Sequence, residues 1–254
     1  MSKTCDVAIV GVTGMIGDVL INVLEDHEFP IERLYLVDEE TSAGGRLMYK
    51  GQSLRVEPLE RFDFSSVRVA LFFCAESVTA IWAPRAVEAG CSVIDGSGHF
   101  RADTSVPLMV AGANPEVLEG RTWPGIVACP DSQVVQAVLA LRAVAGSGLK
   151  ALSIATYQSM STRDLDAVEG LALQTGRLLN GQPPEAGALE KQAAFNLIPR
   201  TGDVDEQGYT RDEIRLTEDL RRIFEAPDMP ISVTCILVPV FYGNAAVAHA
   251  KTAE

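Results

Sequence analysis

Gly11-Val-Thr-Gly-Met-Ile-Gly17 is the most informative stretch of this chain. It follows a short apolar run, Asp6-Val-Ala-Ile-Val10, which is typical of a buried parallel strand. Apolar residues at helical spacing come next and predict a helix that begins near Met15. Glycines at such a turn let the backbone approach a nucleotide pyrophosphate, whose charge the helix N-terminus favours. The pattern is GxxGxxG and not GxGxxG, so glycines kept only for the turn and for helix packing are the structural alternative.

Strands and helices alternate after this loop. Apolar runs predict further strands over 34–37, 69–73, 92–95 and 125–128. Between the second and third of these, the pattern over 77–90 predicts a helix that Gly90 ends. The alternation is typical of a doubly wound parallel sheet of the Rossmann type, which we expect as the first domain.

The pattern changes at Pro130, where a longer amphipathic helix follows with Asp131 or Ser132 at its N-cap. Beyond it, helices are predicted over 166–179 and 212–224, and strands over 152–157 and 232–242. Long strands mixed with helices favour an α+β second domain with a largely antiparallel sheet. We therefore expect two domains, 1–131 and 132–254. The proline-containing segment 180–187 predicts a surface excursion.

Composition excludes several classes of protein. Hydrophobic residues make up 47% of the 254 residues and charged residues 22%, which excludes a disordered chain. The net charge of −13 argues against binding to nucleic acid or to an anionic membrane surface. Five scattered cysteines and three isolated histidines give no metal-ligand spacing, so we expect no metal site and a reduced, cytoplasmic location. The most apolar stretch, 231–247, is interrupted too often by Pro239, Gly243 and Asn244 to span a bilayer.

The chain resembles the aspartate-semialdehyde dehydrogenase family from residue 7 to residue 248. The landmarks that carry the resemblance are GVTGMIG (11–17), EFPIERLYL (28–36), SAGG (42–45), DFSSV (63–67), VIDGSGHFRAD (93–103), ANPE (113–116), ATYQ (155–158), LLNG (178–181), KQAAFNLIP (191–199), GYTRDE (208–213) and PVFYG (239–243). The resemblance implies a Rossmann domain followed by a catalytic and dimerisation domain. It also implies a dimeric enzyme that uses NADPH to reduce an aspartyl phosphate through a thioester on a cysteine.

Three catalytic positions of the family carry other residues here. The resemblance places the nucleophile at Ser132, the histidine base at Asn244 and the substrate-carboxylate arginine at Leu237. A serine needs an adjacent base to attack, and an asparagine amide does not exchange a proton near neutral pH. Cys129 as a displaced nucleophile is the alternative, but it precedes Pro130. Because the nucleophile, the base and the carboxylate-binding residue are all replaced, we expect that the dehydrogenase reaction has been lost.

Other residues match positions that contact the substrate in the family. The resemblance makes Gln158 the residue that orients the acyl intermediate and Arg101 the residue that holds the substrate phosphate. It also places three further residues in the substrate pocket, namely Lys191, Asp212 and Arg215. The structural alternative pairs Arg101 with Asp95 or Asp103, and Asp212 with Arg215, as surface charge pairs.

The cofactor side combines retained and changed residues. The resemblance assigns nucleotide contacts to Gly11, Thr13, Gly14, Met15, Ile16, Gly17 and Asp38. Asp38-Glu39-Glu40 repels the 2′-phosphate of NADP, whereas an acidic residue at this strand end can accept the ribose hydroxyls of NAD. Glu76 adds a negative charge near the expected pyrophosphate. The family's SGAG loop is replaced by Ser161-Thr-Arg-Asp164, which removes a close backbone approach.

Pro130-Asp131-Ser132 is similar to the signature of Usg-1-type paralogues within the family. We therefore favour a catalytically inactive protein that keeps the fold for ligand binding or for dimerisation, as a homodimer or with a paralogue. An NAD(P)-dependent semialdehyde dehydrogenase of amino-acid biosynthesis with altered specificity stays open, as does a serine acyl-hydrolase built on Ser132. Family members continue well past the strand that ends in FYG. The resemblance therefore implies that the C-terminal part of the second domain is missing and that a sheet edge is exposed.

Overall fold

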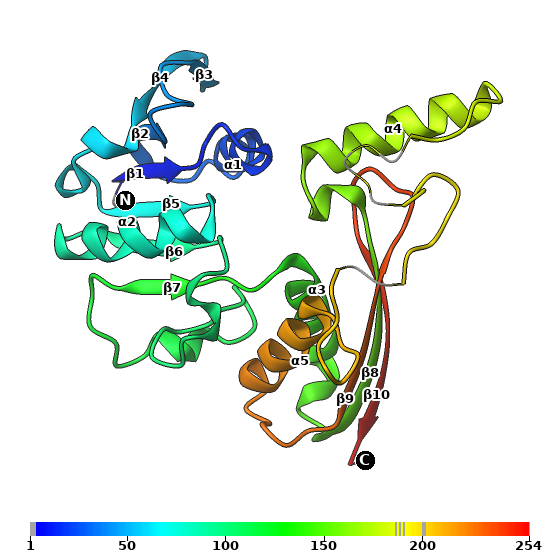
Figure 1. Cartoon of the computed structure of the whole chain (residues 1–254). Coiled ribbons are helices and arrows are strands. Elements are labelled where there is room, and N and C mark those ends of the chain that lie inside the picture. Colours follow the sequence, from blue (N-terminus) through cyan, green and yellow to red (C-terminus); the bar gives the residue numbers. More distant parts are fainter. Residues whose placement is uncertain (1–3, 186, 188, 190, 200–201, 254) are drawn as a thin grey trace. The chain divides into compact units, whose positions relative to one another are not determined.

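The computed structural model describes residues 4–185, 187, 189, 191–199 and 202–253 (Figure 1). The chain divides into two compact units, Met1–Asp131 and Ser132–Glu254. Among the described residues, no helix is long and apolar enough to cross a membrane.

The first unit is built on a seven-stranded sheet with the order β3-β4-β2-β1-β5-β6-β7. Its strands are β1 (Cys5–Val10), β2 (Ile31–Asp38), β3 (Arg46–Tyr49), β4 (Gln52–Pro58), β5 (Val69–Phe72), β6 (Ser92–Asp95) and β7 (Ile126–Ala128). All neighbouring pairs are parallel except β3 with β4. The predicted Rossmann-type parallel sheet is therefore confirmed.

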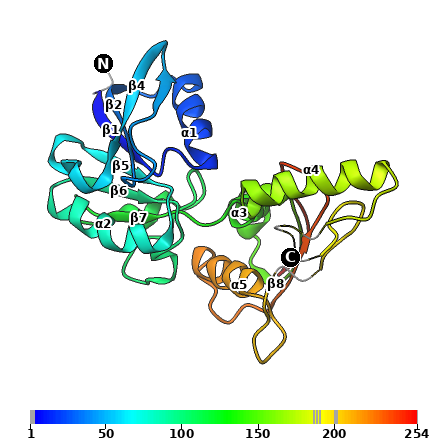
Figure 2. The same cartoon turned by 45° about the horizontal axis from the view of Figure 1, so that its top comes forward.

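Two apolar clusters fill this unit because successive side chains of a strand face opposite ways. Ala8 and Val10 of β1 join one cluster, and Val7 and Ile9 join the other. Helix α1 (Met15–Asp26) buries Ile21 in the second cluster, and α2 (Glu76–Glu88) buries Ala83 and Ala86 in the first. Figure 2 shows α1 and α2 on either side of the strands. The carboxyl ends of β1 and β2 thus meet beside the start of α1, where the glycine loop lies.

The β3–β4 hairpin is absent from the elements expected above. Its strands are joined by Lys50 and Gly51, whose φ angles of 47° and 73° make a turn suited to a two-residue hairpin. The Glu25 carboxylate of α1 accepts a hydrogen bond from the Lys50 backbone N–H and anchors this turn. The hairpin extends the parallel sheet at one edge with an antiparallel strand.

The second unit combines a three-stranded sheet with three helices. Its elements are α3 (Ser132–Ala145), β8 (Leu149–Gln158), α4 (Leu165–Leu179), α5 (Arg211–Ile223), β9 (Ile231–Leu237) and β10 (Ala245–Thr252). The strand order is β10-β8-β9, with β8 antiparallel to β10 and parallel to β9. The sheet is therefore mixed, and not largely antiparallel as expected. Helices α3 and α5 contact each other and the sheet (Figures 1 and 2).

The expectation of one long strand over 232–242 was wrong. Strand β9 ends at Leu237, because Pro239 lacks the N–H that a ladder needs and Gly243 turns the chain with a φ of 89°. The chain then returns along β8 as β10, with Ala245 opposite Tyr157. This reversal brings Asn244 back to the end of β8. The described part of 180–187 contains no helix or strand, and residue 186 lies outside the described residues.

Candidate functional site

Steric crowding requires glycine at two positions of the glycine loop, Gly11 and Gly17. A Cβ on Gly11, whose φ is 87°, would lie 2.5 Å from the Phe73 carbonyl oxygen. A Cβ on Gly17 would lie 1.8 Å from the Val12 carbonyl oxygen. Gly14 is the N-cap of α1, and the helix has no side-chain cap there. The N-terminus of α1 is therefore placed to accept an anion.

Asp38 binds the glycine loop directly. Its side chain is 7% exposed, and its Oδ2 accepts hydrogen bonds from the Thr13 backbone N–H at 2.8 Å and the Thr13 hydroxyl at 2.7 Å. Its Oδ1 accepts the Glu39 backbone N–H at 2.8 Å. The carboxylate expected to hold a ribose thus ties the loop to the end of β2. A ribose hydroxyl would have to share it with Thr13.

Arg101, the expected phosphate ligand, forms an ion pair with Asp131. The Arg101 side chain is 3% exposed, and its Nη1 lies 2.5 Å from the Asp131 Oδ2. Asp95, one of the partners considered above, accepts hydrogen bonds from the backbone N–H groups of Ser97 and Phe100. The guanidinium therefore already holds an anion, supplied by the residue that precedes α3.

Ser132 and Asn244 lie side by side although 112 positions separate them. The Asn244 Nδ2 donates to the Ser132 Oγ at 3.2 Å, and the Ser132 hydroxyl donates to the Gln133 Oε1 at 3.4 Å. The Asn244 Oδ1 accepts the backbone N–H of the buried Ser159 at 3.0 Å. Because both neighbours of the Ser132 hydroxyl are amides, neither can take its proton near neutral pH.

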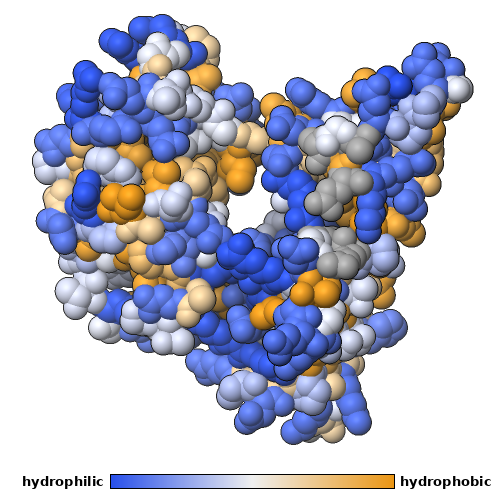
Figure 3. Space-filling model, viewed as in Figure 1, coloured by the Kyte–Doolittle hydropathy of each residue, from blue (hydrophilic) through white to orange (hydrophobic). Residues whose placement is uncertain are grey.

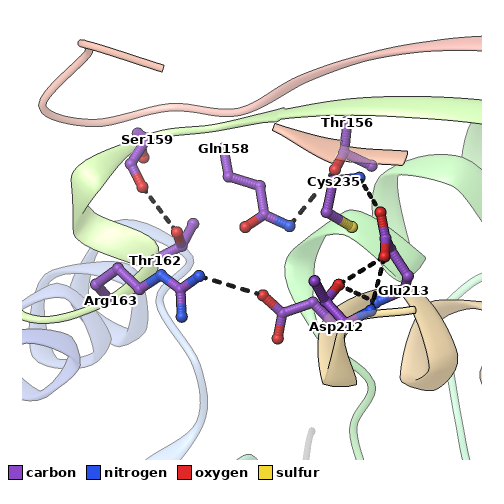
Figure 4. Close-up of polar contacts among 9 residues, drawn as sticks. Thr156, Gln158, Ser159, Thr162, Arg163, Asp212, Glu213 and Cys235 are labelled. Carbon is purple, nitrogen blue, oxygen red and sulfur yellow. Dashed lines mark hydrogen bonds and ion pairs between the residues drawn. The ribbon is translucent and has the colours of Figure 1, made fainter. Parts of the chain in front are cut away.

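Gln158 ends β8 and is 4% exposed. Its Nε2 donates to the Thr156 hydroxyl at 3.4 Å (Figure 4). Leu237, opposite Gln158 in the β8–β9 register, is buried in an apolar cluster with Met160. Leu237, which the resemblance matches to the family's substrate-binding arginine, is thus part of the core.

Side chains hold the loop that replaces the family's glycine-rich segment. The Thr162 hydroxyl donates to the Ser159 carbonyl at 2.7 Å, and Asp164 caps α4 by accepting the Ala167 N–H at 2.7 Å. Arg163 reaches across to α5, where its Nη2 lies 3.6 Å from the Asp212 Oδ2 (Figure 4). This ion pair joins two elements, whereas the pairing considered above, Asp212 with Arg215, lies within one helix.

The sequence reasoning missed Glu213, which is 8% exposed. Its Oε2 accepts both the backbone N–H and the hydroxyl of Thr210 at 2.8 Å, and its Oε1 accepts the Cys235 N–H at 3.1 Å (Figure 4). The Thr-x-x-Glu spacing of a capping box could have revealed the first pair. The link to β9 has no local sequence signal. Lys191, by contrast, is exposed, and its carbonyl accepts a hydrogen bond from the Gln174 Nε2 at 3.4 Å.

Cys91, Cys129 and Cys235 are poor nucleophiles at neutral pH. Burial, with a contribution from the Asp95 carboxylate, raises the pKa of the Cys129 thiol to about 11. Burial also raises the pKa of Cys91 to about 12 and that of Cys235 to about 11. A protonated thiol neither attacks a carbonyl efficiently nor binds a metal. The described residues contain no cluster of histidine, cysteine and carboxylate side chains that could hold a metal ion.

Two family models match the chain. One is described as "Semialdehyde dehydrogenase, NAD binding domain" and matches residues 6–121. The other is described as "Semialdehyde dehydrogenase, dimerisation domain" and matches residues 140–254.

Individual relatives extend over nearly the whole chain. Aspartate-semialdehyde dehydrogenase 2 of Vibrio cholerae is 38% identical over 253 residues, which cover 99% of this chain and 75% of the relative. A USG-1 protein homolog of Azotobacter vinelandii is 40% identical over 245 residues, 96% of this chain and 73% of the relative. The crystal structure of aspartate semialdehyde dehydrogenase II complexed with ASA from Vibrio cholerae matches with a TM-score of 0.94 at 38% identity, over 99% of this chain and 75% of that one.

Proposed function

Because the chain belongs to the semialdehyde dehydrogenase family, we propose that it is an aspartate-semialdehyde-dehydrogenase-like protein without dehydrogenase activity. In this proposal the fold is kept for dimerisation or for ligand binding. The observation that carries it is the contact between Ser132 and Asn244, which stand where the family resemblance places the cysteine nucleophile and the histidine base.

The chemistry of this pair supports the loss of activity. A cysteine thiolate attacks an acyl group readily, and the thioester that forms as the leaving group departs is a species that accepts hydride. The Ser132 hydroxyl instead accepts a hydrogen bond from the Asn244 amide and donates one to the Gln133 side-chain oxygen. Neither amide is a base that can remove the hydroxyl proton. The same lack of a base argues against a serine acyl-hydrolase. Cys129 does not restore the nucleophile, because burial and Asp95 keep its thiol protonated.

The substrate side supports the same conclusion. Leu237 removes the positive charge that a substrate carboxylate would meet, and it lies 6% exposed among apolar side chains. Arg101 is paired with Asp131, so a substrate phosphate would compete with a carboxylate 2.5 Å away.

The residues of the first unit fit a dinucleotide only in part. The uncapped N-terminus of α1 and the turn at Gly11 suit a pyrophosphate. The 2′-phosphate of NADP would meet the acidic end of β2, where Asp38 is bound to Thr13 and where Glu39 and Glu40 follow. We infer that NADP binds weakly and that NAD is the better fit of the two.

A turnover assay tests the proposal. Purified protein is incubated with aspartate semialdehyde, phosphate and either NADP or NAD, and reduced nicotinamide is followed by absorbance. The Vibrio cholerae relative is the positive control. We expect no phosphate-dependent signal above the reaction without protein. Saturable turnover that disappears in Ser132→Ala would overturn the proposal.

A triple replacement tests which losses matter. Ser132→Cys, Leu237→Arg and Asn244→His together restore the three side-chain types that the resemblance implies. We expect partial recovery of activity at most, because Asp38 and the Ser161–Asp164 loop still differ on the cofactor side. Recovery to the level of the relative would show that the cofactor side is intact.

The second candidate is an NAD-dependent semialdehyde dehydrogenase of altered specificity. The anion-accepting N-terminus of α1 is the observation that favours it. Calorimetric titration with NAD and with NADP tests this second candidate before any substrate is known. Saturable binding of NAD keeps this candidate, and absence of binding at millimolar cofactor removes it.

We also propose that the protein is a homodimer, or pairs with a paralogue, through its second unit. Strand β10 lies at an edge of its sheet, with most of its side chains exposed. Exposed apolar residues precede it and lie on it, namely Val240, Phe241, Tyr242 and Val247. Exposed apolar side chains of this kind form a surface that a second chain can cover.

A further inference from the structure

The sheet of the second unit has one covered face and one exposed face. Helices α3 and α5 lie against one side of β8, β9 and β10 (Figure 1). Side chains that point to this side are buried, and Ile154 and Val233 are only 2% and 5% exposed. Because successive side chains of a strand alternate between faces, the residues next to these point to the other side. Ser153 and Ser232, which pair with each other, are exposed there.

The strand registers place His249 of β10 on this exposed face. It lies opposite Ser153, which is paired with Ser232 of β9, so that one row of side chains crosses all three strands. The side chain of His249 is exposed. The next row on the same face consists of Val247, Ala155 and Thr234. We call the face that these two rows form the outer face.

The strands of the outer face contain no carboxylate. Strands β8, β9 and β10 include no aspartate or glutamate, although the chain has 34 of these residues. Helix α5, by contrast, carries Asp212, Glu213, Glu218 and Asp219, and the surface over it is mainly hydrophilic (Figure 3). In a chain with a net charge of −13, the outer face is therefore a surface that a second copy can approach without meeting strand carboxylates.

A second copy of this chain is the partner that fits the outer face. Most side chains of the two rows are small, and Val247 is apolar and 48% exposed, so another sheet can pack closely against them. In a two-fold dimer the same surface lies on both sides of the interface. All three strands lie within residues 140–254, which match the family's dimerisation model. The inference below rests on the homodimer proposed above.

We propose that two copies pack through their outer faces and that protonation of His249 separates them. In such a dimer, His249 meets the groups that the same three strands offer. The other titratable side chains on this face are Tyr157 and Lys251, and neither type is an anion at neutral pH. A protonated imidazole would lose water there without gaining a carboxylate, so the dimer disfavours the charged form.

The effect of this histidine on association has the opposite sign to the effect of the net charge. Acidification reduces the negative charge of each copy, which by itself strengthens association. Histidine ordinarily gains its proton between about pH 8 and about pH 5. Excluding the proton from one histidine of ordinary basicity weakens association about tenfold at about pH 5.5, and a symmetric dimer contains two such histidines.

Sedimentation velocity of the full chain at pH 8 and pH 5.5 tests the proposal, at a constant high ionic strength that screens the net charge. We expect the dissociation constant to rise by about tenfold to a hundredfold at the lower pH. His249→Gln should keep the affinity measured at pH 8 and lose this rise. His27→Gln removes an exposed histidine at the end of α1 in the first unit, so it is the matched control and should keep the rise.

Ser153→Glu tests the position of His249 independently. It places a carboxylate directly opposite the imidazole, where a cross-strand pair stabilises the protonated form. This variant should associate more weakly than the parent at pH 8 and should also lose the rise at pH 5.5.

The proposal is overturned if the parent dimer is as tight at pH 5.5 as at pH 8, or if His249→Gln weakens as much as the parent does. A dimer of that kind would leave the proposed homodimer standing. A chain that is monomeric at both pH values would overturn the homodimer as well.

Discussion

The side chain of Asn244 connects three segments of the second unit by hydrogen bonds. Its amide donates to Ser132 with one atom and accepts from Ser159 with the other, so both ends are used within the protein. A histidine at this position could exchange a proton, whereas the amide only fixes the positions of its neighbours. The contact therefore has the character of a structural tie between α3, the end of β8 and the start of β10.

Asp38 makes a comparable tie in the first unit, and we predict that Asp38→Asn lowers the free energy of unfolding by about 1–3 kcal/mol. Whichever way the asparagine amide turns, its NH2 group faces a backbone N–H, either that of Thr13 or that of Glu39. Urea unfolding monitored by circular dichroism measures the change. The control is Glu40→Gln, which breaks only an exposed pair with Arg61 and should change stability by less than about 1 kcal/mol. Equal effects of the two variants would contradict the structural role of Asp38.

The Cys129 thiol predicts a pH dependence of stability. Its folded pKa of about 11 lies above the ordinary value of 9.0, so folding favours the protonated thiol. That contribution is complete below pH 9 and is lost as the pH rises through 11. We expect stability to fall between these values, and to fall less steeply in Cys129→Ala. Urea midpoints measured across this range check it, and identical slopes for the two proteins would exclude a contribution from this thiol.

The sequence predicts which residues belong to the candidate site better than it predicts the ion pairs that those residues form. It placed Ser132, Asn244 and Leu237 as a group, and the structure brings Ser132 and Asn244 into contact. It did not find the pairs Arg101–Asp131 and Arg163–Asp212. Such pairs depend on how loops return to a sheet, and local periodicity carries no information on that. The roles of these site residues in substrate and cofactor binding stay predictions.

At the scale of elements, Glu213 connects α5 to β9. Its carboxylate accepts two hydrogen bonds from Thr210 and one from the Cys235 backbone. We predict that Glu213→Ala lowers the free energy of unfolding by at least about 2 kcal/mol, because it removes a cap and leaves buried donors unpaired. Glu218→Ala, an exposed position on the same helix, is the matched control and should have little effect. Chemical unfolding of both variants decides whether the link is structural.

The regular elements of the first unit were predictable because each has a local signature. Buried parallel strands are apolar runs, and β6 and the start of α1 lie where the patterns predict them. The β3–β4 hairpin was missed because β3 is only four residues long and β4 consists largely of polar residues. In the second unit, the apolar run over 232–242 hides a chain reversal, since β9 and the residues after it are similarly hydrophobic. Only the pairing of β10 with β8 separates them.

At the scale of the whole molecule, net charge and exposed apolar surface have opposite effects on the association of two copies. Two copies that each carry a charge of −13 repel, while the exposed apolar side chains before and on β10 favour association. We predict a dimer in sedimentation velocity experiments whose affinity rises with salt, because salt screens the repulsion. Val247→Lys, at an exposed position on β10, should weaken the dimer. A monomer at all salt concentrations would contradict this assignment, and so would a dimer that the variant leaves unchanged.

The central claim is that Ser132 does not act as a nucleophile. Intact-protein mass spectrometry after incubation with aspartate semialdehyde and NAD or NADP, quenched in acid, tests it most directly. The Vibrio cholerae relative is treated in parallel. We predict that the mass of this chain does not change, because the Asn244 and Gln133 amides cannot accept the Ser132 proton. An acyl adduct that maps to the peptide containing Ser132, and is absent in Ser132→Ala, would contradict the account.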